Sequence, residues 1–221
     1  MRKKIFLSFW LLLTIDIVTV MFNSCSKDDN IEQYDPLTDK GVIINGVKWA
    51  TRNVDKPSTF AAKLEDAGMF YQWNRNIGWS ATNPMVNSND ETEWEWMPVI
   101  PEDDSWTKVN DPSPVGWRLP TLDEIKSLLN TEKVNSEWTT VKGITGRKFT
   151  DKSTGNSIFL PAAGYRNEGG GTLYNRGDGG NYWSSMQLDS EFAYCLIFWN
   201  DHLGWFDNGR WNCRSIRSVA E

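Results

Sequence analysis

Hydrophobic and polar positions follow one another in short runs along this chain, a pattern typical of β-strands rather than of long helices. Residues 42–44 and 47–54 flank Asn45-Gly46, the dipeptide that most favours a tight hairpin turn. A second hairpin is predicted around Thr154-Gly155-Asn156. Further strands are predicted at 67–73, 147–149, 157–160, 162–166, 181–185, 192–198 and 215–219.

One segment follows the helical period instead. Thr121 and Glu124 have the spacing of a capping box, in which each side chain bonds the other residue's backbone N–H. Apolar residues at 122, 125, 128 and 129 share one helical face, and the helix should end near Asn130. The pattern predicts an α+β domain with one clear helix, a twisted and mostly antiparallel sheet, and long loops.

The loops are rich in aromatic residues. The chain has 13 tryptophans and 17 glycines, which predicts a large aromatic core with rings left over for a binding surface. Residues 76–110 show no regular period, and long loops of this kind are often functional. We expect Trp79, Trp94, Trp96 and Trp106 of this loop to form a second wall of the binding site.

The N-terminus has the features of a secretory signal peptide, with three basic residues at 2–4, an apolar run over 5–22 and a small residue, Ser24, before Cys25. A transmembrane helix is the alternative, but Asp16 lies within the apolar run and is costly in a bilayer. We therefore predict a signal peptide over residues 1–24.

Cys25 and its neighbours resemble a bacterial lipoprotein signal, in which the cysteine is acylated. Ser26-Lys27-Asp28-Asp29 resembles the lipoprotein export signal of Bacteroidota. This resemblance implies lipidation at Cys25, attachment to the outer membrane and display at the cell surface. An ordinary signal peptide with Cys25 as a bystander is the alternative. Residues 25–40 are predicted to be a flexible tether, and residues 41–221 a single domain.

Charge and composition exclude several functions. The chain carries −6 overall, and the first 24 residues hold three basic residues and one acidic residue, so the mature chain carries −8. This acidity argues against nucleic acid as a partner. The chain has one histidine, His202, and no arrangement of a catalytic triad, phosphate loop or zinc site. We predict no enzyme activity, no cofactor and no metal. Trp199-Asn200-Asp201 matches a calcium-lectin tripeptide, but its companion motif is missing, so chance explains it better.

Several motifs in order resemble one known family, the Fibrobacter succinogenes major paralogous domain. They are Val47-Lys48-Trp49-Ala50-Thr51-Arg52-Asn53-Val54, Asp66-Ala67-Gly68-Met69-Phe70-Tyr71-Gln72-Trp73, Pro114-Val115-Gly116-Trp117-Arg118-Leu119-Pro120-Thr121, Leu160-Pro161-Ala162-Ala163-Gly164-Tyr165-Arg166, Tyr182-Trp183-Ser184-Ser185 and Ser215-Ile216-Arg217-Ser218-Val219. That family is similar to C-type-lectin-like and formylglycine-generating-enzyme-like domains. The resemblance implies that both chain ends join one sheet and that a long loop region carries the ligand site.

Two departures from the family pattern concern cysteine. Relatives commonly have cysteines where this chain has Ser113 and Ser218, which implies that a family disulfide is missing and that packing alone holds the ends. Formylglycine-generating relatives use a reactive cysteine pair, and neither Cys195 nor Cys213 matches it. These two cysteines either form one disulfide or remain unpaired.

The segment between Ser185 and Ser215 has unusually mixed chemistry, and it resembles the variable region of proteins diversified by retroelements. We expect ligand contacts there from Trp199, Asp201, His202, Trp205, Phe206, Asp207 and Trp211. The alternative is a fixed strand-loop-strand segment whose tryptophans belong to the core. The predicted function is binding of an extracellular protein or glycan. The alternatives are an appendage subunit and a degenerate enzyme.

Overall fold

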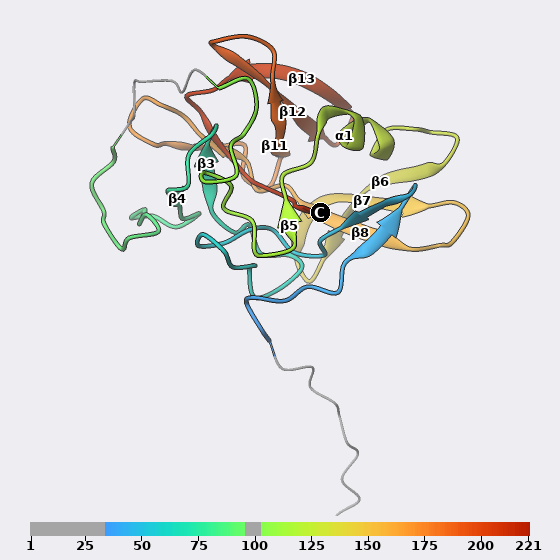
Figure 1. Cartoon of the computed structure of the whole chain (residues 1–221). Coiled ribbons are helices and arrows are strands. Elements are labelled where there is room, and N and C mark those ends of the chain that lie inside the picture. The colour runs from blue at the N-terminus through green and yellow to red at the C-terminus, as the bar shows by residue number, and fades with distance from the viewer. Residues whose placement is uncertain (1–33, 96–102) are drawn as a thin grey trace, which may run out of the picture. The chain divides into compact units, whose positions relative to one another are not determined.

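The computed structural model describes residues 34–95 and 103–221. The predicted signal peptide, Cys25, the first part of the predicted tether and Trp96 lie outside these residues. The described chain is mostly β, with one short helix and four antiparallel sheets (Figure 1). The predicted single helix and antiparallel pairing are confirmed, whereas the prediction of one sheet is wrong, because short strands separated by long loops form four.

The first sheet joins both ends of the domain. Its strands are β1 (Val42–Ile44), β2 (Val47–Trp49), β15 (Val219–Ala220) and β5 (Trp117–Arg118), in the order β1-β2-β15-β5. Asn45 and Gly46 both have positive φ, as the predicted hairpin turn requires. Val219 pairs with Trp49 on one side and with Arg118 on the other. The N-terminal hairpin is therefore held by the last strand of the chain.

A hydrogen bond joins Ser113 and Ser218, the two positions at which the family resemblance implies a lost disulfide. The Ser113 and Ser218 hydroxyl oxygens lie 2.7 Å apart, and both side chains are buried. The expectation that packing alone holds this region is therefore wrong, because the two serines also bond each other across 105 residues of sequence.

The second sheet is built of short strands from distant parts of the chain. Its strands are β10 (Leu173–Tyr174), β9 (Tyr165–Arg166), β14 (Cys213–Arg214), β3 (Phe70–Gln72) and β4 (Gly78–Trp79), in that order. The guanidinium of Arg166 is buried and donates to the carbonyls of Ser80, Thr82 and Gly171. One arginine thus fixes two loops beside this sheet.

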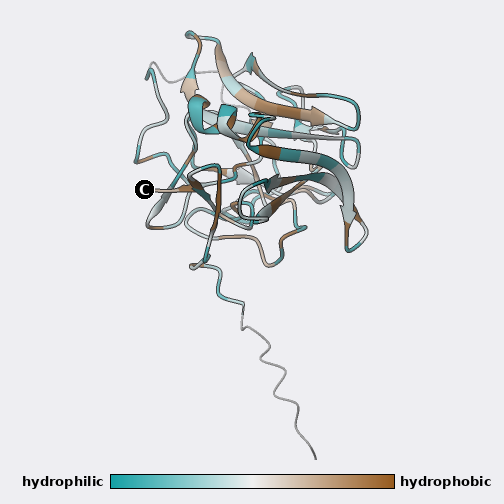
Figure 2. Cartoon of the chain, turned by 90° about the vertical axis from the view of Figure 1, so that its right-hand side faces the viewer, coloured by the Kyte–Doolittle hydropathy of each residue, from teal (hydrophilic) through white to brown (hydrophobic). Residues whose placement is uncertain are grey.

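Two three-stranded sheets complete the fold. One consists of β6 (Val134–Val141), β7 (Ile144–Asp151) and β8 (Ser157–Pro161), and the other of β11 (Gly179–Gln187), β12 (Phe192–Trp199) and β13 (Leu203–Gly209). The predicted strand over 215–219 is wrong in its centre, because β14 ends at Arg214 and β15 begins at Val219. Figure 2 shows hydrophobic stretches in the strands at the top of the domain.

The helix α1 (Leu122–Leu128) has the predicted capping box, and its C-cap is Leu129. Its buried residues Ile125 and Leu128 belong to one core cluster with Leu196 and Phe198 of β12. Cys195 and Ile197 of the same strand belong to a second cluster around Trp183. Because successive strand residues face opposite sides, β12 lies between two cores.

The ordered domain begins before the predicted boundary at residue 41. The hydroxyl of Tyr34 donates to the carbonyl of Phe60, and the Asp39 carboxylate accepts from Thr51 and Arg52. The amide of Phe60 donates to the carbonyl of Pro36. Residues 34–40 are therefore bound to the domain, which corrects that part of the predicted flexible tether.

Candidate ligand-binding surface

The β12–β13 hairpin carries most of the residues predicted to contact a ligand. Trp199 ends β12, Asp201 and His202 form the turn, and Trp205, Phe206 and Asp207 lie on β13. The sequence predicted no element between the strands at 192–198 and 215–219, but residues 203–209 form a strand there that pairs with β12. Trp205, Phe206 and Asp207 are consecutive exposed residues, with Trp205 43% and Phe206 37% exposed.

Strand alternation divides these residues between two sides of the hairpin. Trp205 pairs with Leu196 and Asp207 with Tyr194, so both share the side that packs on α1. The Trp205 ring lies 5.8 Å from the Tyr194 ring, and the Lys126 ammonium lies 5.0 Å from its centroid. Tyr194 was not among the predicted contact residues, although it lies two residues from Leu196 in the predicted strand and therefore on the same side of it.

An aromatic row occupies the other side. The His202 ring lies 5.4 Å from Trp199 and 5.2 Å from Phe206. Trp199 is half-buried against the second core cluster, whereas His202 and Phe206 are exposed. The hairpin residues predicted to contact a ligand therefore form two adjoining surfaces rather than one continuous patch.

Trp211 is separate from both surfaces. It follows β13 and packs against Phe192 at 5.7 Å. The neighbouring Arg210 is buried, with its guanidinium 4.1 Å from the centroid of Trp73. Arg210 also donates to Gln187, and burial lowers the pKa of its guanidinium. Trp211 thus lies at the opposite end of β13 from the turn.

The turn of the hairpin is fixed by an arginine of another sheet. The Arg147 guanidinium donates to the carbonyls of Trp199 at 2.7 Å and of Asn200 at 2.9 Å. A positive charge bonded to these oxygens opposes a calcium ion in the same place. This contact agrees with chance as the explanation of the Trp199-Asn200-Asp201 match.

The structure supports the predicted second wall of the binding site only in part. Trp106 is buried and packs against Trp73 at 5.6 Å, so it belongs to the core. Trp79 is also largely buried, and Trp94 packs against it at 4.7 Å. The indole N–H of Trp94 donates to the carbonyl of Glu168. Of the predicted residues, Trp79 lines a hollow, and Trp96 lies outside the described residues.

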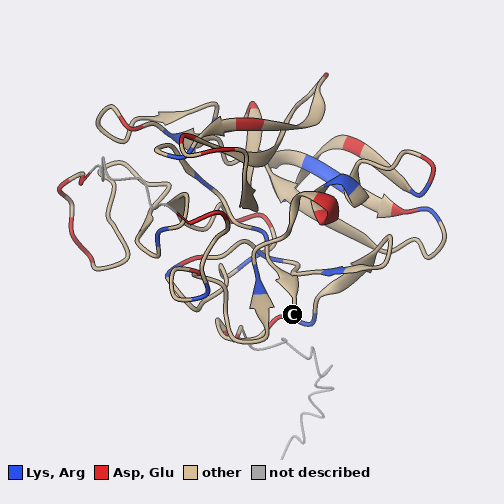
Figure 3. Cartoon of the chain, turned by 45° about the horizontal axis from the view of Figure 1, so that its top comes forward, with Lys and Arg blue, Asp and Glu red and all other residues tan. Residues whose placement is uncertain are grey.

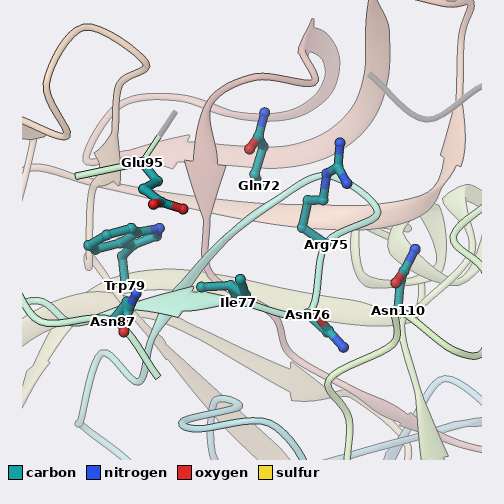
Figure 4. A pocket seen from close by; sticks show the side chains of 8 residues that line it. All are labelled: Gln72, Arg75, Asn76, Ile77, Trp79, Asn87, Glu95 and Asn110. Carbon is teal, nitrogen blue, oxygen red and sulfur yellow. The ribbon is translucent and has the colours of Figure 1, made fainter. Parts of the chain in front are cut away.

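The hollow encloses about 540 Å³, its open mouth included. Ile77 and the Trp79 ring form its apolar part, and the Glu95 carboxylate lies above Trp79 (Figure 4). The remaining lining residues are Gln72, Arg75, Asn76, Asn87 and Asn110. Amides and opposite charges around an apolar floor suit a small polar ligand or one side chain of a larger partner. Six of the eight lining residues lie within residues 76–110, the loop that the sequence predicted to be functional, and Gln72 and Arg75 lie just before it.

The two cysteines are free thiols on different sheets. Cys195 lies on β12 and Cys213 on β14, and both are buried. Of the two states open from the sequence, the unpaired one is found, and the disulfide alternative is contradicted. Burial raises the pKa of Cys195 to about 11 and that of Cys213 to about 12. A reactive cysteine needs a low pKa and access to solvent, and these two have neither.

The raised thiol pKa values predict a loss of stability at alkaline pH. An unfolded thiol ionises near pH 9, so the stabilisation from a protonated buried thiol is complete below pH 9 and is lost between about pH 9 and 11 for Cys195 and between about pH 9 and 12 for Cys213. We expect the free energy of unfolding to fall by up to about 1.4 kcal/mol per pH unit for each thiol. Urea unfolding between about pH 7 and 10.5 measures this slope. The Cys195→Ala/Cys213→Ala variant should have a smaller slope, and an equal slope contradicts the prediction.

Neither a metal-binding cluster nor a membrane-spanning helix occurs among the described residues. Residues 34–95 and 103–221 contain no group of three or more His, Cys, Asp or Glu side chains placed to hold a metal ion. No helix within the same ranges is long and apolar enough to span a bilayer.

No family model, no curated protein and no solved structure matches this chain. The site must therefore be interpreted from its own geometry.

Proposed function

We propose that this chain is a surface-displayed, lipid-anchored binding protein that recognises an extracellular ligand with its β12–β13 hairpin. The observation that carries the proposal is the exposure of Trp205, Phe206 and Asp207 as three consecutive residues of one edge strand. Exposed aromatic rings on both sides of an edge strand cost solubility and provide rigid contact area, so they favour a binding surface. His202 and Asp207 add directional polar groups to the two sides of the hairpin.

The proposed fold is a C-type-lectin-like domain of the major paralogous type. Two observations support it. The first and last strands share one sheet, as the resemblance implies. Ser113 and Ser218, which replace the two family cysteines, are in direct contact. Because these residues are far apart in sequence, their contact favours an ancestral disulfide at the same place.

The position of the hairpin suits display away from the cell. The described chain begins at Tyr34 at the bottom of Figure 1, whereas β12 and β13 lie at the top. With Cys25 as the proposed lipid attachment site on the outer membrane, the entry point of the domain would lie nearest the membrane. The aromatic residues of β13 would then be among those farthest from it.

The proposal can be tested by removing the two exposed rings together. We expect Trp205→Ala/Phe206→Ala to weaken binding by about 30-fold or more, because the loss of a single aromatic residue at a binding hot spot costs about 2 kcal/mol and the second loss adds to it. The measurement is binding of the labelled protein to arrays of glycans and of extracellular proteins. Val115→Ala, which alters a residue that is 97% exposed on a distant loop, is the matched control. Unchanged binding by the double variant, with folding preserved, contradicts the proposal.

Diversification of this segment is a further part of the proposal, and the structure restricts where it is tolerated. Exposed positions 205, 206 and 207 accept many side chains, whereas Cys195 and Leu196 lie in the cores on the two sides of β12. Deep sequencing of the coding region in a natural population should show substitutions at the exposed positions and conservation at the buried ones. A segment that is invariant throughout would leave a fixed binding protein.

A further inference from the structure

Among the described residues, no strand pairs with the outer edge of β13. In the three-stranded sheet the order is β11-β12-β13, so β13 pairs on one side only. The amide of Trp199 donates to the carbonyl of His202, and the amide of Arg210 donates to the carbonyl of Glu191. With the continuous register between them, these bonds direct the amides of Gly204, Phe206 and Asn208 toward β12.

The alternate residues of β13 point the other way. The N–H and C=O groups of Leu203, Trp205 and Asp207 face outward. No backbone hydrogen bond outside the strand ladders uses these groups within the described chain. Six hydrogen-bonding groups are therefore available along about 14 Å of strand.

Apart from the carboxylate of Asp207, this edge lacks the features that normally prevent strand addition. Proteins protect exposed edges with lysine, proline or a β-bulge. β13 contains neither lysine nor proline, and its register with β12 has no irregularity. The outer strand of the other three-stranded sheet, β6, differs, because Glu137 forms an ion pair there with Lys148 at 3.3 Å.

We propose that the outer edge of β13 binds an extended segment of another polypeptide, which adds a fourth strand to the sheet. This inference rests on the proposed function and narrows its ligand class, because alternating donors and acceptors at strand spacing match a polypeptide backbone rather than a glycan. The rings of Trp205 and Phe206 then receive alternate side chains of the added strand, one on each side of the sheet.

Charge and position indicate which polypeptide fits. The exposed ionisable groups of the hairpin beyond His202 are the carboxylates of Asp201 and Asp207, and the whole chain carries −6. Acidic and basic residues are interspersed over the top of the domain (Figure 3). Lys126 lies over the Trp205 ring and forms an ion pair with Asp123 on α1. The fitting partner is therefore an external segment with β-branched or aromatic residues and flanking basic residues.

Amide hydrogen exchange tests strand addition directly. The probe is the acetylated and amidated peptide Lys-Val-Thr-Val-Lys-Val-Thr-Val-Lys, added to the purified protein at about ten times its Kd. We expect exchange at Leu203, Trp205 and Asp207 to slow by about tenfold. Exchange at Gly204, Phe206 and Asn208, already bonded to β12, should change little. The same peptide with proline in place of both threonines should have no effect, because it lacks the required donors.

A matched pair of variants separates the backbone from the side chain. Asp207→Pro removes an outward N–H together with the carboxylate, whereas Asp207→Asn removes only the charge. We expect Asp207→Pro to reduce peptide affinity about tenfold further than Asp207→Asn, in line with loss of one strand hydrogen bond. If Asp207→Pro fails to fold, the alternating exchange pattern of the unaltered protein decides the question.

Other outcomes overturn the inference. Uniform protection, or protection around Trp79 instead of β13, excludes strand addition. Alternating protection that grows with protein concentration in the absence of peptide identifies a second copy as the occupant. If array binding depends on Trp205 and Phe206 while the exchange of β13 amides does not respond to the peptide, the proposed function stands and the polypeptide class fails.

Discussion

Replacing Ser113 and Ser218 together by cysteine is expected to create a disulfide that raises the free energy of unfolding by about 2–4 kcal/mol. The two hydroxyl oxygens lie 2.7 Å apart in a buried position, so the side chains already approach as a disulfide requires. The bridge would join residues 105 apart in sequence. A long loop of this kind removes much conformational entropy from the unfolded chain.

Thermal or urea unfolding with and without reductant measures this gain. For a domain of this size, we expect the Tm to rise by roughly 4–12 °C under oxidising conditions. The gain should disappear when the double variant is reduced. Ser113→Cys alone is the control, because it adds a thiol without a partner. A fully oxidised double variant with unchanged Tm contradicts the prediction.

Replacing Arg217 by methionine is expected to lower the free energy of unfolding by about 3–5 kcal/mol. Arg217 is 1% exposed, and its guanidinium donates to the side-chain oxygen of Asn53 and to the carbonyls of Ala50 and Phe159. Burial lowers its pKa to about 10, so the group stays charged at neutral pH. Methionine fills similar space but leaves three buried acceptors without this donor.

Urea unfolding of a variant pair tests this role. Arg217→Lys keeps the charge but has no planar fork of donors, so it should recover only part of the loss. Arg176→Met is the control, because Arg176 is exposed and, within the described chain, donates to the carbonyl of Ala81 alone. We expect this control to change stability by less than about 0.5 kcal/mol. A loss at Arg217 no larger than that of the control contradicts the prediction.

Local signals predicted the elements that local chemistry encodes. The β1–β2 hairpin followed from Asn45-Gly46, whose backbones adopt the positive φ that the turn needs. The helix followed from the hydrogen bonds of its capping box, which involve residues only three apart. These features depend on neighbours in the sequence, so the sequence was sufficient to place them.

Two long strands were missed for identifiable reasons. The β6–β7 hairpin turns at Lys142-Gly143, where lysine takes a positive φ that asparagine usually supplies. β13 contains glycine, aspartate and asparagine, which are uncommon in strands, and it forms because β12 pairs with it along its whole length. In both cases, tertiary pairing outweighs weak local preference.

The candidate site was likewise predictable from the sequence only in part. The sequence selected Trp205, Phe206 and Asp207, and these side chains are exposed. It did not show that they fall on two sides of a strand, because that requires knowing that residues 203–209 are extended and paired. The sequence predicted the 76–110 loop and Trp79 as part of a binding site but not the hollow itself, because its shape depends on how residues from Gln72 to Asn110 fold together.

The sequence by itself determined the β-rich character, the position of the helix and the N-terminal hairpin, because short-range periodicity and turn chemistry encode them. Only the tertiary structure decided that Ser113 meets Ser218, that Cys195 and Cys213 stay apart, and that β13 has a free edge. Such contacts join residues distant in sequence, and they are stabilised by burial and backbone pairing that no local pattern records.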